Sequence, residues 1–446
     1  MRSELELGAQ ARLQGFLAEL GAGCLRDRRK RESFALYALG LLSGSERKSA
    51  EPLAELYGCD PLEVQHMHDK LLHFVSGSSW DDHDVRQFAA RYAIEELSRH
   101  EPVTTWVIDD TGFLKQGKHS VGVQRQYTGS AGKITNCQIG VSLCVATATT
   151  QLPLDFELYL PEAWTTDPLL RKRGKVPESV GFKTKTHLAL DMIERAVRAE
   201  IPGEILLADS AYGDSNEFRS TVEVLGLDYA VGVSSNITVH LVDASGRARG
   251  PAISAKDLAT KSSLRFRRIT WRAGTRHELS ARFCFVRVKT AHDDGLPLAS
   301  RKEEWLILEW RDSEPEPTKF HLTTLPARMS KTEIVRILEE RWRTERMYED
   351  LKGELGLDHF EGRSYRGWHH HVSVVLCCAA FLVSEQARAF SPRRASPPGP
   401  AAHADSSSAA LRALADDAAP RFRQSRARLA PPLPALPSRS LRRLSA

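Results

Sequence analysis

The sequence has few cysteines, and nothing in their spacing points to a disulfide framework or a zinc site. The seven are Cys24, Cys59, Cys137, Cys144, Cys284, Cys377 and Cys378. They are odd in number and scattered, and none are spaced C-x-x-C. A disulfide-stabilised domain needs paired cysteines, and a structural zinc site needs closely spaced ligands. We interpret these side chains as buried or incidental thiols.

Long apolar runs are also missing. Charged residues make up 27% of the 446 residues, and no uninterrupted apolar run approaches the about 20 residues that a membrane span needs. The first residues, Met1 to Glu6, lack the basic and then apolar pattern of a secretory signal. We therefore expect a cytoplasmic protein with no membrane partner.

The positive charge is concentrated near the C-terminus, although the chain as a whole carries a net charge of +5. Residues 386–446 contain 11 Arg, three Asp and no Glu, so residues 1–385 carry a net charge of −3. Overall charge is therefore weak evidence for a nucleic-acid partner. Two local basic runs remain as candidate phosphate-binding sites, with a solvated surface as the alternative. They are Arg26, Arg28, Arg29, Lys30 and Arg31, and then Arg171, Lys172, Arg173, Lys175, Lys183 and Lys185.

The length predicts two to four domains. Residues 1–95 are predicted to be helical, because apolar residues such as Leu13, Phe16, Leu17 and Leu20 recur at helical spacing. Short apolar strands that later alternate with helices follow in residues 96–227. This order predicts the α/β class, a mixed sheet with helices packed on it.

The helical period disappears between residues 228 and 325, where β-rich stretches predict an inserted subdomain. Residues 326–389 are predicted to be helical again. The last stretch, residues 390–446, is rich in Ala, Pro, Ser and Arg and lacks apolar periodicity, which predicts disorder.

Two apolar segments end in aspartate. The segment Trp106 to Ile108 leads into Asp109 and Asp110, and the segment Ile205 to Ala208 leads into Asp209. A carboxylate at the end of a buried strand lies at the sheet edge, where ligands of α/β folds bind. Asp also favours turns, which explains either position alone, so the pair is the more informative observation.

The second part of the pattern is a helix predicted from Lys331 to Leu355, with Ser330 as its N-cap and Glu333 at the capping-box position. At about 100° per residue, its apolar side chains form one core-facing stripe. The members of this stripe are Ile334, Ile337, Leu338, Trp342, Tyr348 and Leu355.

Three charged residues, Arg341, Glu345 and Lys352, project into the centre of that apolar stripe. A buried carboxylate has to be paired, hydrogen-bonded or bound to metal, because leaving it bare costs several kcal/mol. The purely structural alternative is an internal ion pair between Arg341 and Glu345.

Carboxylates from two strand ends and one helix would form an oxygen-only site suited to Mg²⁺ or Mn²⁺. Two such ions about 4 Å apart activate a water or a 3′-hydroxyl and stabilise the departing oxygen in phosphoryl transfer. Bound cations would also relieve the repulsion among clustered carboxylates.

These residues together resemble the DDE transposases of bacterial insertion sequences, in the group with the signature Y-x2-R-x3-E-x6-K. The elements that carry the resemblance are Asp109-Asp110-Thr111, Ala208-Asp209-Ser210-Ala211-Tyr212-Gly213 and Arg341-x3-Glu345-x6-Lys352. The resemblance covers residues 30 to 385 and implies an RNase H-like sheet interrupted by a β-rich insertion, after a helical DNA-binding domain. Leu338 stands where the signature has Tyr, which puts any role of that phenol in doubt.

The resemblance implies a cut-and-paste transposase that acts on double-stranded DNA, at terminal inverted repeats and target DNA, as a homodimer associated with the bacterial nucleoid. It implies that Asp109, Asp209 and Glu345 bind two Mg²⁺ or Mn²⁺ ions. It also implies that Arg341 and Lys352 approach the DNA phosphates at the cut. Asp109 is preferred as the first ligand because it directly continues the Val107-Ile108 strand, and Asp110 is the alternative.

Other interpretations remain open. A domesticated or inactive transposase-derived protein would bind DNA without cutting it. A carboxylate glycosidase also needs paired acids, but it does not call for Arg and Lys on the same helix face. Consecutive His369, His370 and His371 diverge on a helix, which argues against zinc. Trp164 and Tyr212 either stack on DNA bases or pack in the core.

Overall fold

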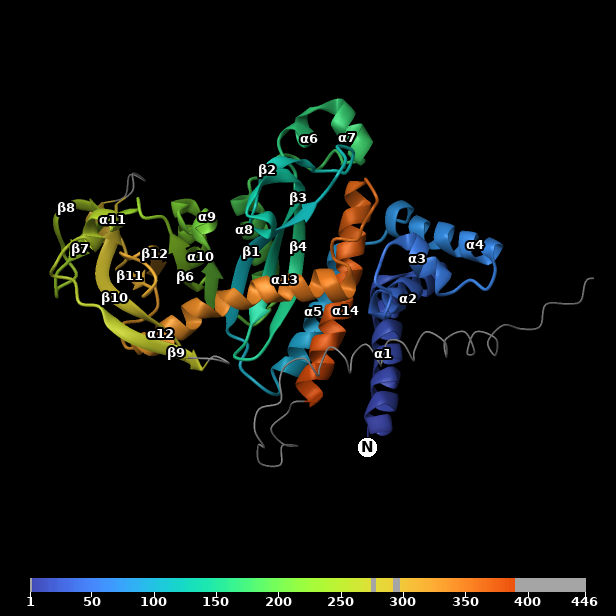
Figure 1. The fold of residues 1–446 in the computed structure, drawn as a ribbon, viewed down its shortest axis with the longest axis horizontal. Coiled ribbons are helices and arrows are strands. Elements are labelled where there is room, and N and C mark those ends of the chain that lie inside the picture. The colour runs from blue at the N-terminus through green and yellow to red at the C-terminus, as the bar shows by residue number, and fades with distance from the viewer. Residues whose placement is uncertain (1, 274–277, 292–296, 390–446) are drawn as a thin grey trace, which may run out of the picture.

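The computed structural model describes residues 2–273, 278–291 and 297–389. The predicted disordered tail, residues 390–446, lies outside the described residues. In the described part the molecule is elongated, with the N-terminal helices at one end, a β-rich part at the other and a mixed sheet between them (Figure 1).

The described N-terminal stretch is helical, as its apolar spacing predicted. Its elements are α1 (Arg2–Cys24), α2 (Arg28–Leu42), α3 (Ala50–Glu55), α4 (Pro61–Leu72), a π-helical turn (His73–Gly77) and α5 (Asp82–Leu97). Asp27, Asp60 and Asp81 begin α2, α4 and α5, and each accepts hydrogen bonds from two backbone N–H groups of the first turn. The predicted limit of this domain at residue 95 stays a proposal.

A single sheet of twelve strands runs through the rest of the described chain. Its order is β2-β3-β1-β5-β6-β12-β11-β10-β7-β8, with β4 paired to β3 and β9 paired to β10. The strands are β1 (Thr105–Leu114), β2 (Gln124–Thr128), β3 (Lys133–Ala146), β4 (Gln151–Tyr159), β5 (Ile205–Ala208), β6 (Asp228–Val233), β7 (Thr238–Val242), β8 (Ala248–Ser254), β9 (Arg267–Ala273), β10 (Glu278–Thr290), β11 (Glu304–Trp310) and β12 (Lys319–Thr323).

Three parallel neighbours, β1, β5 and β6, form the part of the sheet that positions the site. On its other side β1 pairs antiparallel with β3. The strands are apolar inside, and Val107, Ile108 and Leu206 are fully buried. The carboxyl ends of parallel strands meet at one edge of a sheet. The predicted class, a mixed α/β sheet with flanking helices, is confirmed.

The β-rich stretch extends this sheet. β6 pairs antiparallel with β12, which pairs with β11, and β11 pairs with β10. This pairing satisfies the backbone groups that would otherwise lie at an open edge of β6. The hydrogen-bonded ladder is therefore continuous from β5 into the β-rich stretch, and the domain limits at residues 228 and 325 stay a proposal.

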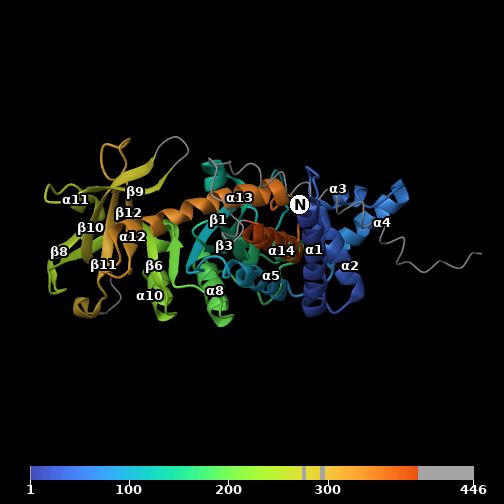
Figure 2. The ribbon, with the colours of Figure 1, turned by 90° about the horizontal axis from the view of Figure 1, so that it is seen from below.

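Helices cover both faces of the sheet. The described helices after α5 are α6 (Ala163–Thr166), α7 (Pro168–Gly174), α8 (Lys185–Arg198), α9 (Ser210–Gly213), α10 (Asn216–Val224), α11 (Ala255–Ala259), α12 (Lys331–Leu338), α13 (Trp342–Leu355) and α14 (Tyr365–Ala389). Of these, α6 and α7 lie beyond the ends of β2 and β3 (Figure 1). Short 3₁₀ turns span Gly129–Ala131, Leu298–Ser300 and Glu339–Arg341. In Figures 1 and 2, α13 crosses one face in front of β1, while α8 and α10 lie on the other face.

The prediction of one helix from Lys331 to Leu355 is wrong in one respect. Its N-cap is confirmed, because the Ser330 side chain accepts from the Glu333 N–H, but the 3₁₀ turn Glu339–Arg341 separates α12 from α13. A 3₁₀ turn advances about 120° per residue and not about 100°. Trp342, the first residue after the turn, lies outside the projected stripe, while Tyr348 and Leu355 are buried as predicted. Trp342, predicted on the core face, is 42% exposed.

Helix α14 is long and apolar enough to cross a membrane, but 67% of its apolar window is buried inside the molecule. It packs between α5 and β4. The side chains of Trp368 and Val372 are almost fully buried. These contacts are those of a core helix, and this burial accounts for its apolar composition.

Candidate active site

Asp109 lies in the middle of β1, directly opposite Ser142 of β3. Sequence analysis placed it at the end of its strand, which is wrong: β1 continues to Leu114 because β3 is long enough to pair with it throughout. The neighbouring strand β5 is shorter and pairs only with Thr105, Trp106 and Val107. Asp109 is therefore the first acidic residue of β1 beyond the end of β5.

Asp209 directly follows β5, as predicted. The parallel register sets Val107 opposite Leu207, so continuing it by two residues brings Asp209 level with Asp109. Asp209 is also the N-cap of α9, where its Oδ1 accepts from the Ala211 N–H at 2.9 Å. The fold thus brings together two carboxylates that are one hundred residues apart in the sequence.

Burial and mutual repulsion disfavour the charged forms of both aspartates. Burial raises the pKa of Asp109 to about 7, Asp209 and Asp110 contribute to the rise, and the Arg341 guanidinium opposes it. Burial likewise raises the pKa of Asp209, with Arg341 opposing and Asp110 contributing. Neighbouring carboxylates with raised pKa values are typical of functional sites, where such repulsion serves binding or catalysis.

Arg341 is the cation that partly compensates this pair. Its Nη1 donates to Asp109 Oδ2 at 2.9 Å, while the other oxygen of Asp109 accepts from the Asp110 N–H at 2.8 Å. The predicted alternative, an internal ion pair between Arg341 and Glu345, is wrong for this structure. The 3₁₀ turn directs Arg341 towards β1 and not along the helix.

Asp110 points to the opposite face of the sheet, as consecutive residues of a strand do. Its Oδ2 forms an ion pair with Lys185 Nζ of α8 at 2.9 Å. The hydroxyl of Tyr212 donates to the same oxygen at 3.4 Å. Asp110 therefore pairs with Lys185, whereas Asp109 pairs with Arg341.

Helix α13 lies against β1 and β3 through two polar contacts. The hydroxyls of Tyr348 and Ser142 are 2.6 Å apart, next to Asp109 in the ladder. One turn further, Lys352 Nζ donates to Thr111 Oγ1 and the Gly112 carbonyl, each at 2.8 Å. A weaker bond to Ser130 Oγ is 3.3 Å long.

Glu345 lies between these contacts. It precedes Lys352 by seven residues, which places both on one face of α13. Arg341 on one side and Lys352 on the other contact β1, so Glu345 belongs to the helix face that lies over the aspartate pair. It was predicted to be buried, but it is exposed, and among the described residues no hydrogen bond or ion pair of its side chain is found.

The first basic run surrounds the start of α2. Arg28 and Arg29 are exposed, and Arg28 forms only an exposed ion pair with Glu32 at 2.9 Å. Arg31 donates to the carbonyls of Leu25 and Arg26, at 2.7 and 3.0 Å. Arg28 and Arg29 are therefore available to an anion, while Arg31 also joins α1 to α2.

The second basic run lies on α7. Lys172 and Arg173 are exposed. Arg171 donates to the carbonyls of Thr165, Val180 and Pro177 at distances of 2.6 to 3.0 Å. Its guanidinium therefore stabilises the loop after α7, and of the three predicted DNA contacts on this helix Arg171 is the one with a structural role.

The aromatic and histidine candidates are part of the core. Trp164 and Tyr212 are buried, so the packing alternative is confirmed for both. His370 stacks on Trp80, and His371 contacts the Tyr37 hydroxyl. Burial lowers the pKa values of both histidines to about 4. Each of them makes a separate structural contact.

A second acidic cluster lies away from the aspartate pair. His83, Asp155 and Glu157 have side-chain atoms within 4.8 Å of one another. Arg86 and Arg195 already contact both carboxylates, with Arg195 at 2.7 Å from each. Burial would raise the pKa of Glu157, but the His369 hydrogen bond and the two guanidinium charges hold it below its usual range. These contacts identify a compensated ion-pair network between α5, α8 and β4.

Sequence analysis missed two groups at the site. Lys185 was predicted only as part of a basic run, and its partnership with Asp110 depends on how α8 packs on the sheet. Ser130 carried no signal at all. It lies in a 3₁₀ turn between β2 and β3 and is 3.1 Å from Thr111 Oγ1.

The residues present fit a divalent cation. Asp109 and Asp209 offer hard oxygen ligands side by side. Burial is the main cause of their raised pKa values, neighbouring carboxylates add to the rise, and Arg341 only partly offsets it. Glu345 adds a free carboxylate on the overlying helix face. Oxygen-only donor sets of this kind suit Mg²⁺ or Mn²⁺.

Comparison with known proteins gives a family for this arrangement. The family model of the DDE superfamily endonucleases matches residues 22–278, more than half of the chain. The chain belongs to the DDE superfamily endonucleases. The matched range includes Asp109 and Asp209, and membership implies dependence on a divalent metal. Glu345 lies beyond it.

Two known proteins are similar to this chain to different extents. A probable transposase for insertion sequence element IS701 from Microchaete diplosiphon is 29% identical over 217 residues, which are 48% of this chain and 52% of that protein. The chain thus spans about half the length of this relative. A cryo-EM structure of a piggyBac transposase synaptic complex with hairpin DNA has a TM-score of 0.44 and 12% identity, over 95% of this chain and 79% of that one. At this TM-score the likeness says nothing further about the chain.

The contacts of Lys352 in this DDE endonuclease predict the effect of removing it. Its partners are hydroxyls and a carbonyl, so Lys352→Ala leaves no buried carboxylate unpaired and should cost at most about 2 kcal/mol of unfolding free energy. If the ammonium holds a phosphate in the transition state, cleavage should slow by about 10²-fold. Thermal unfolding and cleavage rates measured on one preparation test this. A large fall in melting temperature with normal cleavage would assign Lys352 a structural role.

The raised pKa of Asp109 predicts how stability depends on pH in the metal-free protein. The unfolded chain releases this proton near its ordinary pKa, while the folded chain holds it to about pH 7. Stability should therefore fall as pH rises from about 4 to about 7. Asp109→Asn should remove this part of the fall and raise the unfolding free energy at pH 8 by on the order of 1 to 4 kcal/mol.

Urea unfolding in EDTA at pH 5 and pH 8 measures this difference. Asp110→Asn is the matched control, because Asp110 is paired with Lys185 on the other face of the sheet. Equal gains in both variants, or a loss in Asp109→Asn, would contradict the electrostatic account.

Proposed function

We propose that this protein is the transposase of a bacterial insertion sequence, which cuts double-stranded DNA at its element's terminal inverted repeats and joins the ends to target DNA. The observation that carries the proposal is the meeting of Asp109 and Asp209, from parallel strands, beneath the helix face that bears Arg341, Glu345 and Lys352. Family membership supports the same class of chemistry.

In this proposal Asp109, Asp209 and Glu345 hold two Mg²⁺ or Mn²⁺ ions. Bound in this way, two divalent ions activate the attacking oxygen and stabilise the leaving oxygen of a phosphodiester. The chain's own residues provide the geometry. Arg341 orients Asp109, and Lys352 contacts β1 just beyond Asp109, where it can hold a non-bridging phosphate oxygen. Asp110 and Lys185 support β1 from the opposite face.

The remaining assignments are also proposals. The helical part, residues 1–95, binds the element's ends, residues 228–325 form the β-rich insertion, and residues 96–227 with 326–389 form the catalytic part. The protein acts as a homodimer on DNA in the bacterial cytoplasm, associated with the nucleoid. Two DNA ends cut together require two catalytic sites, which a two-fold dimer supplies.

The direct test is to incubate the purified protein with Mg²⁺ and the genomic DNA that flanks its gene, and to map the cuts at nucleotide resolution. We expect metal-dependent nicks at the two ends of a repeated sequence. Binding to these ends without any cut, in Mg²⁺ or in Mn²⁺, would favour a domesticated or inactive DNA-binding protein. Cleavage that persists in EDTA would contradict the proposed chemistry.

The exposed cations at the start of α2 allow a test of the DNA-binding part. Replacing Arg28 and Arg29 by Ala should weaken DNA binding and reduce the slope of log K against log salt by about 0.9 for each phosphate that these side chains neutralise. The control is the double variant Arg249→Ala with Arg268→Ala. It removes the same amount of positive charge, but from two arginines that each form an ion pair with an aspartate. If the two double variants have equal slopes of log K against log salt, the basic residues at the start of α2 are a solvated surface and not a DNA contact.

A further inference from the structure

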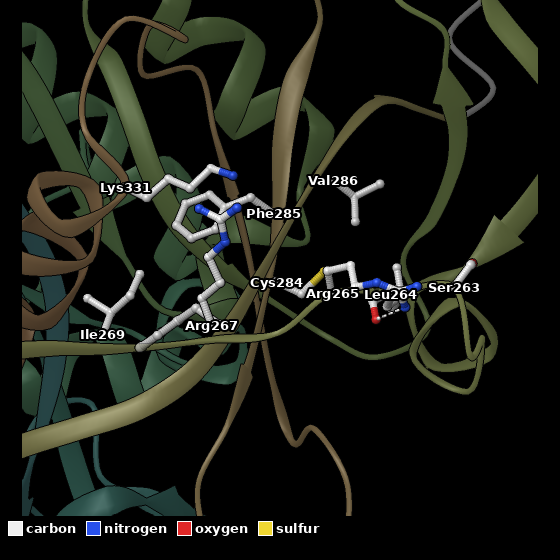
Figure 3. Close-up of a pocket in the computed structure, with 10 residues that line it drawn as sticks. Ser263, Leu264, Arg265, Arg267, Ile269, Cys284, Phe285, Val286 and Lys331 are labelled. Atoms are coloured by element: carbon white, nitrogen blue, oxygen red, sulfur yellow. Dashed lines mark hydrogen bonds between the residues drawn. The ribbon is translucent and has the colours of Figure 1, made fainter.

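A cavity of about 240 Å³ lies in the β-rich part of the sheet, apart from the aspartate pair. Figure 3 shows the side chains that line it, which come from β9, β10, the segment before β9 and the first residue of α12. They are Ser263, Leu264, Arg265, Arg267, Ile269, Phe283, Cys284, Phe285, Val286 and Lys331. The lining contains three cations and no carboxylate.

The cavity exists because the sheet is split along one edge of β10. On one side β10 pairs with β11 from Arg282 to Val288. On the other side it pairs with β9 only up to Phe283 and with β7 only from Val288. Residues 284–287 thus have no ladder partner on that side among the described strands. In an antiparallel strand alternate residues direct their N–H groups to each side, so the N–H groups of residues 284–287 that face away from β11 have no ladder acceptor among the described strands.

Arg267 and Lys331, beside this gap, pair with no carboxylate in the part of the chain that the structure describes. In Figure 3, Arg267 and Lys331 extend towards the Phe285 ring. The Lys331 ammonium lies 5.2 Å from the centre of that ring and 5.8 Å from that of Trp305. Among the described residues, neither Arg267 nor Lys331 forms an ion pair with a carboxylate. Burial raises the pKa of Cys284, and Lys331 opposes the rise, so its positive potential reaches the cavity wall.

Neighbouring arginines on the same two strands behave differently. Arg268 and Arg282 both pair with Asp312, at 2.8 and 3.5 Å, and Arg287 pairs with Glu303 at 2.8 Å. These three arginines each have a carboxylate partner, whereas Arg267 and Lys331 have none among the described residues. Cations that converge on a hollow with free N–H groups favour an anionic ligand.

We propose that this cavity binds a backbone phosphate of DNA, with Arg267, Lys331 and the open edge of β10 as donors. The cavity is smaller than the roughly 300 to 1,000 Å³ of typical small-molecule sites, which suits a single phosphate group better than a whole nucleotide. The Phe285 ring provides an apolar wall for the adjoining sugar. The choice of DNA as the source of the phosphate rests on the proposed function.

The test measures DNA binding by the full chain at a series of salt concentrations, using fluorescence anisotropy with a labelled duplex of mixed sequence. Wild type is compared with Arg267→Ala, Lys331→Ala and the double variant. The double change should reduce the slope of log K against log salt by about 0.9, the value for the one phosphate that the cavity holds, and each single change should reduce it by part of that amount. Both residues are exposed, so folding should persist, and thermal unfolding checks this.

Arg268→Ala is the matched control. Arg268 neighbours Arg267 on β9, is similarly exposed, and pairs with Asp312. The Arg268→Ala variant should have the same slope of log K against log salt as wild type, within error. A slope that stays unchanged in the Arg267 and Lys331 variants, or an equal fall in Arg268→Ala, would overturn the phosphate site.

Two further measurements separate the other outcomes. The first is calorimetric titration with inorganic phosphate. Suppose that phosphate binds to wild type but not to the double variant, while the slope of DNA affinity against salt is the same in both. The cavity would then bind a free anion, and the DNA assignment would be overturned. Metal-dependent cleavage is measured on wild type alongside. If wild type cuts DNA while the variant slopes are unchanged, only the cavity proposal fails. If wild type neither binds nor cuts DNA, both proposals fail.

Discussion

Asp109→Asn, Asp209→Asn and Glu345→Gln should each reduce metal-dependent strand cleavage by about 10³-fold or more, because each removes about 4 kcal/mol or more of transition-state stabilisation. DNA binding should persist in all three variants. Asp109 contacts Arg341, Asp209 accepts from a backbone N–H, and Glu345 is exposed without a described partner. The neutral isosteres therefore leave the cationic surfaces intact. Cleavage and binding are measured on the same preparations with DNA ends mapped for the wild type.

Asp110→Asn is the matched control for this series, since Asp110 is adjacent in β1 but paired with Lys185 on the opposite face. It should retain part of the activity. An inactive Asp110→Asn beside an active Asp109→Asn would show that the first ligand is Asp110. Full activity of Glu345→Gln would remove α13 from the metal site, and an equal loss of binding and cutting in all three variants would contradict the metal assignment.

Arg86→Ala should destabilise the protein more than any other single change discussed, by about 3 to 5 kcal/mol of unfolding free energy. The Arg86 side chain is 2% exposed and contacts three carboxylates, those of Asp82, Asp155 and Glu157. Its removal leaves Asp155 and Glu157 with Arg195 and His369 as remaining partners, in a buried region where solvent poorly replaces the missing charge.

Urea unfolding at neutral pH measures this loss. Arg28→Ala is the control, because Arg28 forms its ion pair with Glu32 at an exposed site, and such pairs contribute about 0 to 1 kcal/mol. A loss in Arg86→Ala as small as in this control would mean that the α5, α8 and β4 network contributes little net stability. A Mg²⁺-dependent gain in stability that survives Asp109→Asn but disappears in Asp155→Asn would instead identify the second acidic cluster as a metal site.

Local sequence patterns predicted the elements of this protein well where the signal is itself local. Apolar spacing predicted the helices before residue 95, and Ser330 was predicted correctly as an N-cap, because a cap depends on a few adjacent residues. The alternation of strands and helices predicted the mixed sheet. The two strand-linked aspartates and the spacing of Arg341, Glu345 and Lys352 were sufficient to indicate the metal-dependent chemistry of the family.

Long-range packing decided what local patterns could not. The 3₁₀ turn before α13 is a small change in backbone angle, yet Trp342 lies at the surface directly after it and Arg341 within it reaches Asp109. No periodicity contains such a break, because its cause is the fit of α12 and α13 to separate parts of the sheet.

The sequence alone determined which carboxylates and cations the protein has and which elements carry them. The register of β1 with β5 decided that Asp109 lies level with Asp209, and the alternation of side chains in β1 decided that Asp109 and Asp110 face different partners. The tertiary structure also decided that Lys185 and Ser130 join the site and that Arg171 does not remain free. The positions of Asp109 and Asp110 depend on pairing between strands about one hundred residues apart in the chain, and a shift of register by one residue would exchange the faces to which these two side chains point.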